Sequence, residues 1–367
     1  MKKIVLQISL FLASANLFAQ APAGYYNNAT SEGYTLKTQL YNIIKGHTTK
    51  SYDALKSLYR QTDSNNGFQD KYYEKDNTIL DIYSENPTGK DPYNYTPGQK
   101  ECGNYGVEGD CYNREHIVPQ SVFKESSPMV SDPFHIWPTD GKVNGVRSNY
   151  PHGMVANPTT TSKNGSKLGA NSNTGYSAGY SGIVFEPIDE FKGDVARAYF
   201  YFATRYQENG IQGWTYAMFN NTKDKVFTDT FLKILMTWHI NDPISQREID
   251  INNLVYNYQG NRNPFIDHPE YAEKVWGSNL GTDDFVYQKR DDIKVYNKTN
   301  RSVVVKLENN QKSIQKISVF NLNGQLVNEV QNSTHQKEVN VDFKTPGVYI
   351  IKVVGPEMEI NRKVVIK

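Results

Sequence analysis

The segment NREHIVPQ, residues 113–120, places a cation, a carboxylate and an imidazole on the consecutive residues Arg114, Glu115 and His116. A neutral imidazole can take a proton from water near pH 7, and a carboxylate oxygen is a ligand for a hard cation. Adjacent side chains of a regular strand point to opposite faces, so Glu115 and His116 share one site only where the strand ends. Pro119 supplies that end, because it has no N–H to donate to a ladder. The alternative is a polar, solvated strand edge.

A second group of polar residues follows in the stretch DPFHIWPTDGKVNGVRSNYPHG. The apolar residues Phe134–Trp137 predict a short strand, after which Thr139 or Asp140 can cap a helix. On that helix Asn144 and Arg147 lie three positions apart and share a face. A strand with a histidine, a second strand and a helix with an asparagine make a ββα-metal unit. Its carboxylate and amide oxygens suit Mg²⁺, which keeps several waters and leaves positions open for phosphate.

Two further histidines leave another interpretation open. His135 and His152 could join His116 as ligands of a zinc hydrolase. The chain has neither an HExxH motif nor the paired-cysteine spacing typical of zinc sites. We therefore expect His135 to be a hydrogen-bonded core residue and His152 to lie at the mouth of the site.

The N-terminus has the pattern of a secretory signal. Lys2 and Lys3 precede a mostly apolar run, Ile4–Phe18, and small residues follow, so residues 1–21 are excluded from the fold. This run is too short for a stable membrane span, and no other stretch approaches the ~20 apolar residues that one requires.

Export removes the signal segment and places the chain in an oxidising compartment, which affects its net charge and the state of its cysteines. Removing the two leading lysines lowers the 40 Lys and Arg residues to 38, against 39 Asp and Glu, so a globally basic binder of polyanions is excluded. Any contact with nucleic acid must come from a local basic patch. Cys102 and Cys111 lie nine residues apart, and an oxidising compartment favours a disulfide between them over a zinc site.

Periodic patterns predict a mainly helical region that must carry this site. Helices are expected from Tyr34 to Ile44, through Leu55 and Tyr59, from about 191 to 206 and from 229 to 239, and a capping box of Ser245 and Glu248 opens another that Gly260 ends. Residues 78–83 predict a strand. The Ser-, Thr-, Asn- and Gly-rich stretch 156–182 predicts a long loop or a weak hairpin.

The chain changes character near Asp291. Strand alternation then dominates, and Asn323 and Gly324 predict a two-residue hairpin turn. At 367 residues the chain suits one sizeable domain and one small domain. We expect an α+β fold, in which residues 22–285 form a mainly helical domain around the ββα-metal unit and residues 286–367 form a small all-β sandwich.

Five blocks, in order, carry a resemblance to a known family. REHIVPQS, DPFHIWPTDGKVNGVRSNYPHG, VFEPIDEFKGDVARAYFYFATRY, WHINDPISQREIDINNLVYNYQGNRNPFIDHPE and VWG together resemble the bacterial secreted and periplasmic endonuclease I family. The blocks extend over about residues 30–280. The strands VFNLNGQLV, TPGVYIIKV and KVVIK resemble the C-terminal sorting domain of type IX secretion, although an ordinary accessory β-sandwich has similar strands.

The resemblance implies a role for each residue of the predicted unit. His116 matches the general base, and Glu115 and Asn144 match the ligands of one cation, Mg²⁺ with Mn²⁺ or Ca²⁺ as alternatives. The products are expected to carry 5′-phosphate ends. Some family members use an arginine between the catalytic histidine and the second strand to hold phosphate, but this chain has no arginine between Arg114 and Arg147. We therefore assign the phosphate contact to Arg147.

Further substrate contacts are expected from Arg114, Lys142 and Asn149. The implied protein is a monomeric endonuclease that cuts DNA, RNA or both with little sequence preference. It is exported by the type IX machinery, either into the medium or to the cell surface. A second hypothesis is a secreted binding or adhesion protein on an inactive nuclease scaffold, which the intact residues Glu115, His116 and Asn144 argue against.

Overall fold

The computed structural model describes residues 21–277 and, in the C-terminal region, residues 293–299, 301–307, 313–321, 325–333, 336–355 and 358–366. The predicted signal segment, apart from its last residue, and the predicted turn at Asn323 and Gly324 lie outside the described residues. The chain falls into two compact units, Met1–Asp284 and Phe285–Lys367. The domain division made from the sequence stays a prediction, and we describe each unit by itself.

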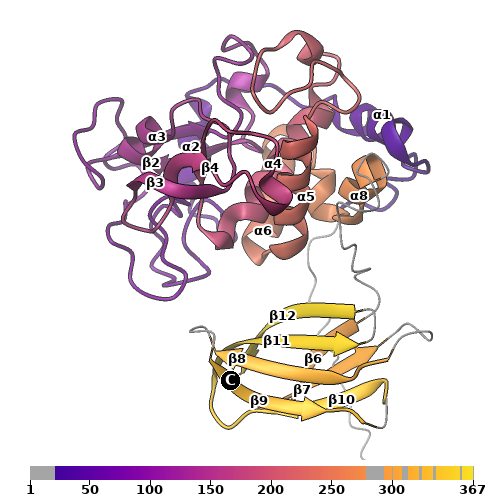
Figure 1. Ribbon diagram of the computed structural model, residues 1–367. Coiled ribbons are helices and arrows are strands. Elements are labelled where there is room, and N and C mark those ends of the chain that lie inside the picture. Colours follow the sequence, from indigo (N-terminus) through magenta and orange to yellow (C-terminus); the bar gives the residue numbers. More distant parts are fainter. Residues whose placement is uncertain are drawn as a thin grey trace, which may run out of the picture. The chain divides into compact units, whose positions relative to one another are not determined.

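The first unit contains both helices and short strands (Figure 1). Its helices are α1 (Gly33–Ile44), α2 (Ala54–Arg60), α3 (Gly141–Arg147), α4 (Lys192–Arg205), α5 (Asp229–Asn241), α6 (Gln246–Gln259), α7 (Pro264–Asp267) and α8 (Glu270–Trp276). Its strands are β1 (Tyr112–His116), β2 (Ile136–Asp140), β3 (Val155–Thr161), β4 (Lys167–Asn171) and β5 (Ile183–Glu186). The mixed content confirms the α+β class. None of the helices in the described ranges is long and apolar enough to cross a membrane.

Helix α4 is the centre of this unit. All of its residues are buried, so other elements pack around the whole helix. Its buried charges are paired with α6, where Arg197 bonds to Glu248 and Asp194 accepts from Arg247 at 2.8 Å. The predicted capping box of Ser245 and Glu248 opens α6, which confirms that prediction.

Two predictions for the extended segments need correction. Residues 78–83 form no strand but only an isolated bridge between Gln69 and Ile79, because the Asp81 carboxylate accepts from the Tyr83 N–H at 2.8 Å and turns the chain. In the stretch 156–182 the hairpin alternative is confirmed and the long loop is wrong. Strands β3, β4 and β5 pair antiparallel in one sheet.

The second unit consists of two antiparallel sheets (Figure 1). One has the order β10-β7-β6 and the other β12-β11-β8-β9, from strands β6 (Ile293–Thr299), β7 (Ser302–Leu307), β8 (Lys316–Asn321), β9 (Leu326–Gln331), β10 (Glu338–Asp342), β11 (Gly347–Gly355) and β12 (Met358–Ile366). Alternate side chains of both sheets, such as Val303, Val305, Val319 and Ile351, form one buried core. This is the sandwich that the strand alternation predicts.

Candidate active site

The residues nominated from the sequence lie on a ββα unit. Strands β1 and β2 pair antiparallel, with Glu115 opposite Trp137 and His116 opposite Ile136, and α3 begins directly after β2. Asp140 caps α3 by accepting the Val143 N–H at 2.7 Å. The two strands and the helix therefore form a continuous support for the polar side chains.

Asp140 also ties this unit to distant segments. Its second carboxylate oxygen accepts from the Tyr95 hydroxyl at 2.6 Å and from the Gly109 N–H at 2.8 Å. Its own N–H donates to the buried Asp81 carboxylate at 2.8 Å. These contacts fix the start of α3, and with it the position of Asn144 one turn later.

A cavity of about 650 Å³ opens at the end of β1 and over α3. Six of the residues that line it are among those predicted from the sequence to form the site or to contact substrate: Arg114, Glu115, His116, Asn144, Arg147 and Asn149. Of these, Asn149 is exposed. Lys142 lies on the same helix but is not part of the lining, so its contact with substrate stays a prediction.

Glu115 is buried, with 1% of its surface exposed. Its Oε1 accepts from the Tyr83 hydroxyl at 2.8 Å and lies 3.1 Å from Arg147 Nη1. Burial raises the pKa of Glu115, while Arg147 and Tyr83 oppose that rise because they stabilise the carboxylate. Both partners contact Oε1, and Oε2 has no hydrogen bond or ion pair among these contacts.

His116 follows at the end of β1 and is 6% exposed. Burial lowers its pKa to about 3, and the nearby His135 contributes in the same direction. The imidazole is therefore neutral near pH 7. Its Nε2 is buried and has no hydrogen-bond partner in the described part of the chain, although the ring lines the cavity.

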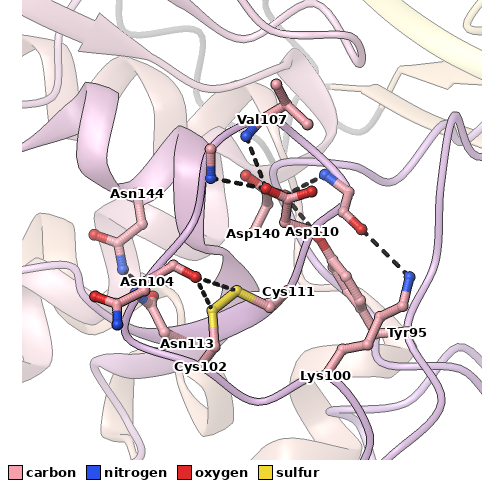
Figure 2. The surroundings of a disulfide bond; sticks show 12 residues. Tyr95, Lys100, Cys102, Asn104, Val107, Asp110, Cys111, Asn113, Asp140 and Asn144 are labelled. Carbon is pink, nitrogen blue, oxygen red and sulfur yellow. Dashed lines mark hydrogen bonds between the residues drawn. A yellow bond between two sulfur atoms is a disulfide. The ribbon is translucent and has the colours of Figure 1, made fainter.

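Asn144 is oriented by β1. Its Nδ2 donates to Asn113 Oδ1 at 2.6 Å, so this hydrogen bond does not use the Asn144 Oδ1 (Figure 2). The same view shows the disulfide between Cys102 and Cys111, which confirms that prediction. The bond closes the loop that leads into β1, and Cys102 lines the cavity.

Arg147 lies beneath the cavity with 1% of its surface exposed. Besides Glu115, its guanidinium donates to the carbonyl oxygens of His116 at 2.7 Å and Ile117 at 2.6 Å. These contacts hold the end of β1 and favour a positioning role. Direct contact between Arg147 and phosphate stays a prediction that the burial does not favour.

Two other cations reach the cavity. The Arg114 guanidinium lies 3.5 Å from the centre of the Tyr52 ring and donates to the Tyr52 carbonyl at 2.9 Å. Lys56, on α2, also lines the cavity, although nothing in its sequence context singled it out. Arg114 and Lys56 are thus placed to attract a polyanion.

The other two histidines are held elsewhere. His135 Nε2 lies 2.8 Å from the Met129 carbonyl oxygen, and His152 Nδ1 lies 3.0 Å from the Tyr199 hydroxyl. Both side chains are fully buried, and neither lines the cavity. This confirms His135 as a core residue, but it contradicts the expected place of His152 at the mouth of the site. The arrangement also gives no support to the zinc interpretation.

Three supporting residues were not found from the sequence. Tyr83 and Asn113 hydrogen-bond to Glu115 and Asn144, and Tyr105 packs so closely on α3 that a Cβ at Gly145 would lie 2.1 Å from its hydroxyl oxygen. Asn113 directly precedes Arg114 in the sequence, and this proximity to the predicted site could have identified it. Tyr83 and Tyr105 meet the site only through the tertiary fold.

Comparison with known proteins agrees with this geometry. Residues 32–270 match the family model Endonuclease I, and residues 294–367 match the secretion system C-terminal sorting domain. The chain is 32% identical over 258 residues to the extracellular ribonuclease of Bacillus amyloliquefaciens, which is 69% of this chain and 78% of that protein. The extracellular ribonuclease of Bacillus subtilis (strain 168) is 33% identical with the same coverage.

A more distant relative is Endonuclease-1 of Buchnera aphidicola subsp. Acyrthosiphon pisum (strain APS). It is 23% identical over 162 residues, which is 44% of this chain and 54% of that protein. The match to the endonuclease I model extends over more than half of the chain, and the sorting domain accounts for most of the remainder. The chain therefore belongs to the endonuclease I family, as a secreted nuclease that carries a type IX sorting domain.

Proposed function

We propose that this protein is a metal-dependent endonuclease that hydrolyses phosphodiester bonds of DNA and RNA and leaves 5′-phosphate ends. One observation carries the proposal: the neutral His116 lines the same cavity as Glu115 and Asn144, at the end of β1 and over α3. A neutral imidazole beside a carboxylate oxygen and an amide oxygen is suited to take a proton from a water held there.

The side chains present fit a hard divalent cation. Glu115 Oε2 and Asn144 Oδ1 are the oxygen types that Mg²⁺, Mn²⁺ and Ca²⁺ share, and the hydrogen bonds of both side chains use their other atoms. We propose that these two residues hold one such cation, with Mg²⁺ preferred. When bound, it would stabilise the charge that develops on the phosphate and on the departing 3′ oxygen.

The protein's own residues then do the following. His116 takes the proton of the attacking water. General-base catalysis of this kind makes hydrolysis about 10²–10⁴-fold faster. Arg147 holds the carbonyl groups of His116 and Ile117, so the imidazole stays oriented toward the cavity. The Tyr83 hydroxyl holds Glu115 in its ligand conformation.

The substrate is bound through its backbone. Two cations, Arg114 and Lys56, and one neutral hydrogen-bond donor, Asn149, line the cavity. Side chains of these types bind phosphate groups and do not distinguish one base from another. We therefore propose little sequence preference and action on both DNA and RNA. The name of two relatives, extracellular ribonuclease, supports RNA as a substrate. We also propose that the protein acts as a monomer, in the medium or attached to the cell surface.

Incubation with supercoiled plasmid and with RNA, in Mg²⁺ and in EDTA, tests the proposal. We expect cutting of both polymers in Mg²⁺, no cutting in EDTA, and products that ligate without prior phosphorylation. Cutting that persists in EDTA would refute the metal dependence, and undiminished cutting by His116→Ala would refute the assigned base. Binding of either polymer without cutting in Mg²⁺ would favour the inactive scaffold instead.

A further inference from the structure

An acidic cluster lies away from the cavity, in the segment that follows α2. Asp70, Glu74 and Glu85 each have one carboxylate oxygen within 4.8 Å of those of the other two. None of the three residues lines the cavity of the proposed active site. Three carboxylates this close repel one another unless something positive lies between them.

Glu85 is the residue that requires explanation. Its surface is 1% exposed, yet both of its carboxylate oxygens lack a hydrogen-bond donor in the described part of the chain. No ion pair joins Asp70, Glu74 or Glu85 to a lysine, arginine or histidine within that same part. A buried carboxylate without a donor or a counter-charge is costly, so such groups are normally paired or bound to a metal.

The other members of the cluster are fixed in place. The Asp70 carboxylate accepts the N–H groups of Tyr72 and Tyr73, both at 2.9 Å, and that of Lys75 at 2.7 Å. Glu74 Oε1 accepts the Asp91 N–H at 2.9 Å, while its buried Oε2 has no donor in the described chain. The vacant oxygens are therefore those of Glu74 and Glu85.

We propose that Asp70, Glu74 and Glu85 bind a structural Ca²⁺ ion, with the nearby Asp91 completing the negative charge of the site. Ca²⁺ takes six to eight oxygens in irregular geometry, whereas Mg²⁺ is usually bound through one or two carboxylates. Three or four carboxylates contributed by an irregular segment therefore favour Ca²⁺. Binding at this site does not depend on the nuclease chemistry proposed above.

The position of the site gives the ion a role. The segment between Asp70 and Glu85 carries Asp81, which accepts from the Asp140 N–H, and Tyr83, which donates to Glu115. An ion that fixes both ends of this segment would hold these two contacts in place. The cation therefore stabilises the support of the active site without touching substrate.

The alternative occupant is a proton. The Glu74 carboxyl lies close enough to Glu85 for the two to share one, and burial together with Asp91, Asp70 and Glu74 raises the pKa of Glu85 to about 9. A shared proton would satisfy the cluster without any metal. The two occupants differ in their response to added Ca²⁺.

Thermal unfolding and equilibrium dialysis of the mature protein with CaCl₂ distinguish them. A ligand at 100 times its dissociation constant raises the folded-to-unfolded ratio about 100-fold. With Mg²⁺ present throughout to occupy the proposed nuclease site, we expect a Ca²⁺-dependent rise in the unfolding temperature of the wild type, and its loss in Glu85→Gln. Without Ca²⁺, Glu85→Gln should be at least as stable as the wild type near pH 7, because it removes a carboxyl group that must stay protonated in the folded state although it ionises in the unfolded chain.

Glu115→Gln is the matched control, because it makes the same change at the proposed nuclease metal site. It should keep the Ca²⁺-dependent stabilisation. Stabilisation that is lost in Glu115→Gln and kept in Glu85→Gln would overturn the proposal, as would a wild type that neither binds nor responds to Ca²⁺. If Glu85→Gln does not fold, Glu74→Gln at the less buried side of the cluster provides the same comparison.

Discussion

Replacing Tyr83 by phenylalanine removes one hydroxyl group and keeps the ring. That hydroxyl donates to Glu115 Oε1 at 2.8 Å in a buried environment, and the ring packs edge-on against Phe185. The substitution therefore leaves the core almost filled. Its effect should come from the lost hydrogen bond.

The size of this effect follows from the partners that remain. A hydrogen bond to a charged group contributes about 1.5–3 kcal/mol, so the free energy of unfolding should fall by about that amount. Within the described part of the chain, Arg147 is then the partner left on Oε1, at 3.1 Å. A group that orients a metal ligand typically changes metal affinity about 10–100-fold, so the half-saturating Mg²⁺ concentration should rise by a similar factor.

The assay is plasmid cleavage at increasing Mg²⁺, combined with urea unfolding. Tyr206→Phe is the control, because the Tyr206 hydroxyl also donates to a buried carboxylate, Asp132, at 2.6 Å, and Tyr206 does not line the cavity. Both variants should lose stability, but Tyr83→Phe alone should need more Mg²⁺. An unchanged Mg²⁺ requirement in Tyr83→Phe, or an equal rise in both variants, would refute the reasoning.

Four further predictions concern other parts of the protein. His116→Ala should cut plasmid about 10²–10⁴-fold more slowly, with an unfolding temperature close to that of the wild type, measured by cleavage rates and circular dichroism. Asn144→Ala should raise the half-saturating Mg²⁺ concentration about 10-fold or more, and Asn144→Asp less, because aspartate restores an oxygen ligand. Replacing Cys102 and Cys111 by serine should lower the free energy of unfolding by about 2–3 kcal/mol, since the closed loop is short. In calcium-free buffer the wild type should lose stability relative to Glu85→Gln as the pH rises from about 4.5 toward about 9. The reason is that the folded-state pKa of Glu85 is raised from 4.5 to about 9, so the unfolded chain releases the proton first. Urea unfolding across this pH range measures the difference in stability.

Local signals predict much of the site. Asp140 as a helix cap, Asn144 one turn later and the strand that ends at His116 all depend on neighbours within a few residues, so their spacing was sufficient. The C-terminal sandwich and the capping box of Ser245 and Glu248 are predictable for the same reason.

The parts that could not be predicted depend on distant partners. Tyr83 reaches Glu115 across 32 positions of sequence, and Asp81 turns a segment whose apolar residues otherwise predict a strand. Arg147 shares a helix with Asn144, so a role in binding phosphate was a reasonable inference. Its burial beneath β1 depends on the packing of the whole unit, which no local pattern contains.

The central position of α4 bears on when the enzyme becomes active. The Tyr199 hydroxyl, on α4, donates to the Ile117 carbonyl at 2.8 Å and lies 3.0 Å from His152 Nδ1, so this helix closes the base of the site. A nascent chain that has emerged only as far as α3 already carries Glu115, His116 and Asn144, but nothing yet supports them. Synthesis of the reactive residues and assembly of the site are thus separated by the length of chain between α3 and α4. A polypeptide that ends before Lys192 should be unable to cut nucleic acid.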